Sequence, residues 1–145
     1  MKYFFTWIST LLVSGLLAQN PDEIAIRQRI EAAGADYARL PLSEVVKKHW
    51  LLNEKSRLIF SGKNGEHVAL VADEMQEANN PPVPGLVTIE RKNFFFSVDG
   101  DLAFVYNEQV VTFSDSGKQL HYNEVRGLVK INGEWKINIA SIHEF

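Results

Sequence analysis

The 145-residue chain contains no cysteine, so it can form neither a disulfide framework nor a thiolate metal site. It also lacks a surplus of positive charge, because 15 Lys and Arg stand against 18 Asp and Glu and give a formal net charge of −3. A protein that binds nucleic-acid phosphates needs such a surplus, so we expect no nucleic-acid partner. With 46% hydrophobic and 23% charged residues, the composition favours one compact domain over a disordered chain.

Several motifs of catalysis and cofactor binding are also missing. The sequence has no G-x-S-x-G motif, no P-loop and no dinucleotide-binding fingerprint. Its four histidines show neither the H-x-H nor the H-E-x-x-H spacing of metal ligands. We therefore expect no nucleophilic serine, no metal ion and no cofactor.

The one long apolar run lies at the start of the chain. Lys2 supplies a positive charge, residues 4–17 are mainly apolar, and the small Ala18 comes before the polar residues 19–20. This pattern is typical of a secretory signal peptide cleaved after Ala18. The alternative is a membrane anchor, but the run is shorter than the roughly 20 apolar residues that a spanning helix needs. The sequence thus predicts a signal peptide at 1–18 and a secreted or periplasmic domain at 19–145, with no membrane contact after cleavage.

The first half of that domain has helical patterns. Asn20 is a predicted N-cap, and the apolar stripe that follows ends before Pro41. A second helix is predicted to begin at a Ser43 cap, and a short strand and a turn are predicted at 56–61 and 62–65. A third helix is predicted over 66–78, with an apolar face made of Val68, Val71, Ala72 and Met75.

The second half reads as strands. Four β-rich runs cover 86–98, 101–114, 118–131 and 134–144. The breaks between them contain Asp-Gly, Asp-Ser-Gly and Asn-Gly, which are strong hairpin signals. We expect an α+β domain with helices first and an antiparallel meander after them.

Two segments of this meander resemble a known family. The run Val98-Asp-Gly-Asp-Leu-Ala-Phe-Val105 and the run Lys130-Ile-Asn-Gly-Glu-Trp-Lys-Ile137 are similar to strands of the NTF2-like superfamily, most of all its SnoaL-like and DUF4440 group. The resemblance implies an NTF2-like (cystatin-like) cone, in which a strongly curved antiparallel sheet wraps around the N-terminal helices and encloses a pocket. It also implies a homodimer formed through the sheet. Members of the superfamily include isomerases, cyclases, dehydratases and plain binding domains.

The turn lengths predict which side chains share a face of the sheet. A two-residue turn at 99–100 places Arg91 opposite Glu108, and cross-strand partners point to the same side. Extended across all four strands, this register predicts a concave face with an apolar floor of Phe95, Phe104, Leu128 and Ile137. Asn107 and Gln109 are predicted on the outer face, together with several charged residues. The predicted pocket residues are Arg91, Tyr106, Glu108, Tyr122, Glu124, Arg126 and His143.

The predicted cluster leaves three hypotheses open. The favoured one is a non-catalytic domain that binds a small, partly apolar molecule in its cone. The second is a cofactor-independent isomerase, cyclase or dehydratase, with Glu124, Glu108 or His143 as base and Tyr106 or Tyr122 as hydrogen-bond donor. The third is a protein-interaction module that uses the outer sheet face. The charges could equally form a structural salt-bridge lattice without a catalytic role, since such networks also shift pKa values.

Overall fold

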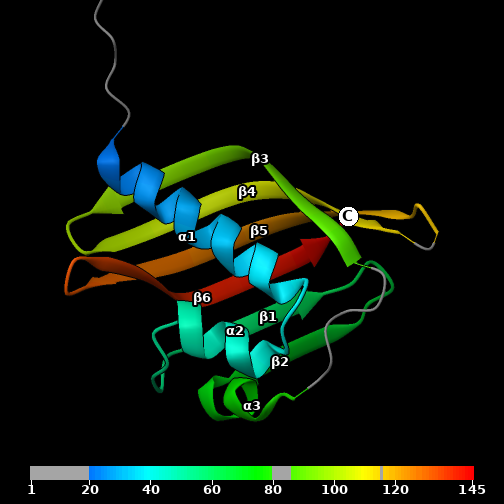
Figure 1. Cartoon of the computed structure of the whole chain (residues 1–145), viewed down its shortest axis with the longest axis horizontal. Coiled ribbons are helices and arrows are strands. Elements are labelled where there is room, and N and C mark those ends of the chain that lie inside the picture. The colour runs from blue at the N-terminus through cyan, green and yellow to red at the C-terminus, as the bar shows by residue number, and fades with distance from the viewer. Residues whose placement is uncertain (1–19, 80–85, 115) are drawn as a thin grey trace, which may run out of the picture.

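The chain folds around one six-stranded sheet that curves over a long helix (Figure 1). The computed structural model describes residues 20–79, 86–114 and 116–145, and the predicted signal peptide lies outside these ranges. None of the helices in these ranges is long and apolar enough to cross a membrane. The elements are α1 (Pro21–Tyr37), α2 (Leu42–His49), β1 (Arg57–Ser61), β2 (His67–Val71), α3 (Ala72–Glu77), β3 (Leu86–Asp99), β4 (Leu102–Phe113), β5 (Gln119–Ile131) and β6 (Glu134–Glu144).

The predicted meander is confirmed, and it forms most of the sheet. The strand order is β2-β1-β6-β5-β4-β3, and β3 to β6 pair antiparallel in sequence order. β1 pairs antiparallel with β2 but parallel with β6, so the sheet is mixed rather than wholly antiparallel. The β1–β2 hairpin thereby extends the meander on one side and adds a wall to the cone.

Helix α1 lies across the concave side of the sheet, as predicted. Asn20 caps it by accepting a hydrogen bond from the Asp22 backbone N–H at 3.0 Å, and Pro21 occupies the first helical turn, where no N–H is needed. Ile26 and Ile30 are fully buried between the helix and the strands. The Trp135 indole N–H donates to the Asp22 carboxylate at 3.0 Å, which ties the start of α1 to β6.

The predicted third helix is wrong in its first half. Residues 67–71 form β2, and only Ala72–Glu77 are helical. The turn at 62–65 folds the chain back onto β1, with Gly65 at a φ of +86°, and Phe60 pairs with Val68. The predicted Ser43 cap is also wrong, because α2 begins at Leu42 and the Ser43 hydroxyl donates to the Asn79 side chain at 3.0 Å.

The turns and bulges set the register of the meander. Asn132 and Gly133 both have positive φ, at 51° and 82°, and Ile131 pairs with Glu134 as predicted. The β3–β4 hairpin turns at Gly100-Asp101 instead of the predicted Asp99-Gly100, so Asp99 pairs with Leu102. Bulges interrupt the ladders between Lys92 and Phe95 and beside Gly127.

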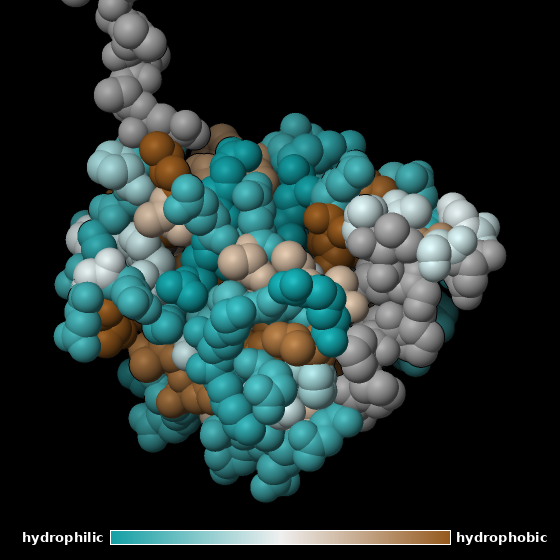
Figure 2. Space-filling model, in the orientation of Figure 1, coloured by the Kyte–Doolittle hydropathy of each residue, from teal (hydrophilic) through white to brown (hydrophobic). Residues whose placement is uncertain are grey.

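The apolar core and the surface divide along the cone. Fully or almost fully buried side chains of α1, β4, β5 and β6 fill the end near the hairpin turns, among them Ile26, Ile30, Val105, Leu128 and Ile137. Figure 2 shows that the face on which the helices lie is mainly hydrophilic, with small hydrophobic areas between the elements. The other end of the cone is not filled by side chains, and the candidate site lies there.

Candidate functional site

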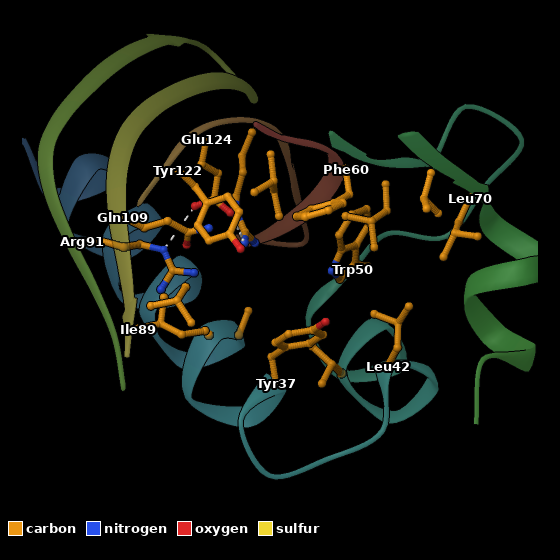
Figure 3. A pocket seen from close by; sticks show the side chains of 18 of the residues that line it. Tyr37, Leu42, Trp50, Phe60, Leu70, Ile89, Arg91, Gln109, Tyr122 and Glu124 are labelled. Atoms are coloured by element: carbon orange, nitrogen blue, oxygen red, sulfur yellow. Dashed lines mark hydrogen bonds and ion pairs between the residues drawn. The ribbon is translucent and has the colours of Figure 1, made fainter. Parts of the chain in front are cut away.

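A cavity of about 410 Å³ lies between α1, α2, the β1–β2 hairpin and the concave face of the meander (Figure 3). Most of its lining is apolar and comes from every wall. Apart from Tyr37 at the end of α1, its polar lining is gathered on β3, β4 and β5. The apolar lining residues include Leu42, Val45, Trp50, Leu58, Phe60, Val68, Leu70, Ile89, Val111, Phe113 and Ile142, and the polar ones are Tyr37, Arg91, Gln109, Tyr122, Glu124 and Arg126.

A buried ion triad forms the polar side of this cavity. Glu124 is fully buried and accepts hydrogen bonds from Arg91 Nε at 3.1 Å and from Arg126 Nη2 at 2.6 Å. The two arginine side chains are themselves only 4% and 8% exposed. Arg91 lies on β3 and the other two residues on β5, with β4 paired between these strands, so the sheet holds the triad in a fixed place.

The surroundings set the protonation states of this site. Burial alone would raise the pKa of Glu124, but the charges and hydrogen bonds of Arg126 and Arg91 outweigh it and lower this pKa to about 2. Burial also raises the pKa of Tyr122 to about 12, with a smaller effect of the Glu144 charge. Near neutral pH, Glu124 is therefore an ionised acceptor and Tyr122 a protonated hydrogen-bond donor.

Several buried polar atoms beside the triad have no partner among the residues that the structure describes. They are Arg126 Nε, Gln109 Oε1 and both side-chain polar atoms of Asn107. Asn107 is fully buried and pairs with Glu124 across the β4–β5 ladder, while Gln109 lines the cavity. Unpaired buried polar groups are costly, so this end of the cone is suited to receive hydrogen bonds from a bound molecule or from water.

The structure brings together four of the seven predicted pocket residues. Arg91, Tyr122, Glu124 and Arg126 line the cavity. Leu128 and Ile137, which were predicted on the apolar floor of the cone, are both buried. Ligand binding by these residues stays a prediction.

The other three predicted pocket residues lie on the outer face, so their placement in the cone was wrong. The Tyr106 hydroxyl donates to the Asn123 side chain at 2.8 Å, and Tyr106 is 38% exposed. Glu108 faces Lys92, with 3.8 Å between its carboxylate and the ammonium group. His143 is exposed and lies 2.8 Å from the Ser141 hydroxyl.

A one-residue slip explains the error in β4. The predicted register needs Glu108 opposite Glu124, but Glu108 pairs with Asn123, so β4 is shifted by one residue against β5 and every β4 side chain points to the face opposite to the predicted one. The turn at Gly100-Asp101 does not cause this reversal, because it still has two residues and leaves the same β3 and β4 side chains on one face. Asn107 and Gln109 therefore point inward, against the prediction, and Phe104 is 60% exposed on the outer face.

The error in β3 follows from that in β4, because Phe95 pairs with Tyr106 and faces outward with it, while the bulge between Lys92 and Phe95 keeps Arg91 inward. A bulge explains the error in β6. Asn93 adopts a φ of +54°, and after it Phe94 and Phe96 pack on the core while Phe95 is 76% exposed. In β6, the bulge beside Gly127 shifts the ladder by one residue, so Arg126 pairs with Ala140. His143 consequently lies on the outer face.

The sequence reasoning missed the wall contributed by the β1–β2 hairpin. Leu58 and Phe60 on β1, and Val68 and Leu70 on β2, all line the cavity. Their spacing of two residues on either side of the turn at 62–65 is a hairpin signal. It could have identified this wall, but a helical spacing from Val68 to Met75 fits the same segment.

A second buried network joins α1 to α2 outside the cavity. Asp36 is 5% exposed and accepts from Arg39 at 2.5 Å, Lys48 at 2.6 Å and His49 at 2.8 Å. The Lys48 hydrogen bond is the largest of the effects that hold the pKa of Asp36 well below its usual range. Burial lowers the pKa of His49, and the hydrogen bond that His49 donates to the Asp36 carboxylate partly offsets this. The network fixes the angle between the two helices that carry the cavity residues Tyr37, Leu42 and Val45.

In the ranges 20–79, 86–114 and 116–145, no group of three or more His, Asp or Glu side chains is placed to hold a metal ion. No protein-family model matches the sequence, and no curated protein matches it.

Solved structures match the fold over most of the chain. A protein of unknown function with a cystatin-like fold from Nostoc punctiforme aligns with a TM-score of 0.66 and 14% identity, over 88% of this chain and 93% of its own. A candidate scytalone dehydratase from Novosphingobium aromaticivorans aligns with a TM-score of 0.65 and 12% identity, over 86% of this chain and 84% of its own. An NTF2-like protein from Cytophaga hutchinsonii aligns with a TM-score of 0.59 and 14% identity, over 88% of this chain and all of its own. The cone and its helices therefore have the NTF2-like, cystatin-like fold.

Proposed function

We propose that this domain binds a small, partly apolar molecule in its cone. The observation that carries the proposal is the cavity of about 410 Å³, with apolar walls and one buried polar side that holds unpaired hydrogen-bonding atoms. Small-molecule sites have this volume, this apolar lining and a few fixed polar groups. We propose that the protein that binds this ligand is the mature domain, which is exported by means of the predicted signal peptide and released by cleavage after Ala18.

Catalysis by a pocket base has less support. Glu108 and His143 lie outside the cavity, and Glu124 is held by two guanidinium groups that make it a weak base. Tyr122 remains as a donor, but a proton transfer also needs a base of matched pKa within reach. A candidate scytalone dehydratase is among the structural neighbours, yet at 12% identity that likeness concerns the fold.

We also propose that two copies associate through the outer face of the sheet. Large apolar side chains are exposed there on neighbouring strands: Phe95 on β3, Leu102, Phe104 and Tyr106 on β4, and Val125 on β5. Phe95 pairs with Tyr106 and Tyr106 with Val125, so these side chains are adjacent across the strands. Exposed apolar patches of this kind mark interaction sites, and a twofold dimer covers both patches with each other. An unrelated protein partner on the same face is the alternative.

Filling the cavity tests the proposed function. The domain 19–145 is purified and screened against a panel of small, partly apolar compounds by thermal shift and calorimetry. Val68→Trp places an indole in the wall of the cavity and is expected to weaken binding at least tenfold. Val71→Trp is the matched control, because Val71 lies on the same strand with similar exposure but does not line the cavity. A domain that binds no compound of the panel, or whose binding survives Val68→Trp, contradicts the proposal.

A further inference from the structure

The charges on the polar side of the cavity do not balance. Arg91 and Arg126 carry two positive charges and Glu124 one negative charge, which leaves one buried positive charge in excess. Among the described residues, the next acid that acts on Arg91 is Glu31 of α1, whose side chain is exposed. Burial is the largest effect on the pKa of Arg91 and lowers it, and the charge of Arg126 lowers it further, so the pKa stays below its usual value although Glu124 raises it.

Arg91 keeps the far edge of its guanidinium group free. Its Nε donates to Glu124, and the described part of the chain offers no hydrogen-bond partner to Nη1 or Nη2. Figure 3 shows this end of Arg91 turned toward the open centre of the cavity. It lies against Gly34 of α1, where a Cβ atom would come within 2.9 Å of Nη2.

Further donors surround this edge. Gln109 pairs with Arg91 on one side and with Tyr122 on the other, so the three side chains form one row on the concave face. Gln109 has an unpaired amide oxygen, and a flip of the amide places its NH₂ group there instead. The Tyr122 hydroxyl stays protonated and can donate. Arg126 Nε, two rows deeper on the same face, is a buried donor that finds no acceptor among the described residues.

We propose that the ligand of the cone is a monocarboxylic acid, whose carboxylate accepts hydrogen bonds from the free guanidinium edge of Arg91 and from the neighbouring Gln109 and Tyr122. This inference rests on the proposed function and adds the chemical class of the ligand. Two parallel N–H groups match a planar carboxylate, and one negative charge cancels the excess of one. The apolar part of the acid lies against the Leu42, Phe60 and Leu70 wall.

A neutral or cationic ligand fits the cavity less well. It would leave the excess charge buried and unpaired after displacing the water around it, and an unpaired buried charge is strongly unfavourable. A phosphate monoester would bring up to two negative charges against an excess of one. The charge count therefore favours a single carboxylate.

Matched triples of compounds test the inference. Each triple holds the acid, the primary amide and the primary amine on one skeleton, for example 4-phenylbutanoate, 4-phenylbutanamide and 4-phenylbutylamine, with octanoate and indole-3-acetate as further skeletons. Calorimetry at pH 7 is expected to give at least tenfold tighter binding of the acid within a triple. This preference should disappear as the pH falls through about 4, where carboxylic acids become neutral.

Two variants locate the carboxylate. Gly34→Ala removes the space of the Arg91 Nη atoms without changing any charge, so it should weaken binding of the acid several-fold and leave the amide unchanged. Arg91→Lys should reduce the preference for the acid, because a lysine cannot pair with Glu124 and the carboxylate through one planar group. Ala32→Ser, at an exposed position of α1, is the control and should change neither affinity.

The outcomes separate this inference from the proposed function. Equal affinities within the triples, or tighter binding of the amide or amine, overturn the carboxylate inference and leave the binding function in place. Acid preference that is unchanged in both Gly34→Ala and Arg91→Lys also overturns it. If no member of any triple binds, and the wider panel is negative too, both proposals are wrong.

Discussion

Glu124 shows how a single carboxylate couples the pocket to the stability of the domain. It is fully buried, and its two partners are the arginines that line the cavity. The burial that would otherwise protonate Glu124 is outweighed by these two charges. Removing the carboxylate leaves the two guanidinium groups buried without a counter-charge, and removing the guanidinium groups leaves the carboxylate in the same state. The triad therefore acts as a unit.

The stability of the domain should therefore fall steeply in acid. The pKa of Glu124 is about 2 in the folded state, against 4.5 for the unperturbed group. A lowered pKa stabilises the fold fully above about pH 4.5, and this contribution is lost as the pH falls toward 2. We expect urea unfolding to show a loss on the order of 3 kcal/mol from Glu124 across that interval.

Glu124→Gln is the control for that measurement. The variant should be less stable at pH 7 by about 3–5 kcal/mol, because two buried guanidinium groups lose their counter-charge. It should also lose less stability between pH 5 and pH 3 than the parent protein does. Parallel curves for the two proteins over that range would show that Glu124 does not carry the acid response.

At the scale of the elements, the α1–α2 corner depends on Asp36. Its carboxylate accepts from Arg39, Lys48 and the buried His49. Asp36→Asn removes the negative charge and should lower the free energy of unfolding by about 2 kcal/mol, as expected for hydrogen bonds to a charged group. The same change removes the partner that raises the pKa of His49, so this pKa should fall further in an NMR titration.

Lys47→Ala is the control for Asp36→Asn, because Lys47 is 57% exposed and its one described ion pair, with Glu44, is 4.0 Å long. Equal stability of Asp36→Asn and Lys47→Ala would contradict the role of Asp36.

The elements themselves were largely predictable from local chemistry. Asn20 and Pro21 mark the start of α1, and Asn132-Gly133 supplies the two positive φ values of a type I′ turn. Asp99-Gly100-Asp101 allows two turns, because Gly100 can be either the second central residue or the first one. The structure uses the second option, which moves the pairing by two residues and leaves the faces unchanged. The side chains of β4 are reversed by the connection to β5 instead, because Glu108 pairs with Asn123 and not with Glu124.

Bulges could not be located from the sequence for a similar reason. Asn93 has a φ of +54°, and asparagine tolerates this conformation better than most residues, but the chain contains many asparagines in ordinary conformations. The need for a bulge comes from the curvature of the sheet around α1, which is a property of the assembled fold. β5 was predicted correctly because its inward side chains, Tyr122, Glu124, Arg126 and Leu128, stand at every second position and are all buried.

At the scale of the whole molecule, the sheet separates two surfaces with different roles. Its concave side holds the triad and the cavity, and its outer side exposes the aromatic residues of β3 and β4. The slip in β4 exchanges these two surfaces, so the same correction that removes Tyr106 from the pocket adds it to the outer patch. Binding and association should thus be separable by substitution.

The proposed dimer gives the most direct test of that separation. Phe104 is 60% exposed and lies among Phe95, Tyr106 and Val125, so Phe104→Glu would place a charge inside the interface and force its desolvation. We expect the parent domain to be a dimer at tens of micromolar by light scattering, and Phe104→Glu to be a monomer that still binds the ligands of the cone.

Phe145→Glu is the matched control, because Phe145 is a similarly exposed phenylalanine, at 56%, on the last residue of the chain. It should remain a dimer. A monomeric parent domain, or a Phe104→Glu variant with unchanged mass, would show that two copies do not meet through this face. Loss of ligand binding in a folded Phe104→Glu monomer would show instead that the cone depends on the partner copy, because no outer-face residue lines the cavity.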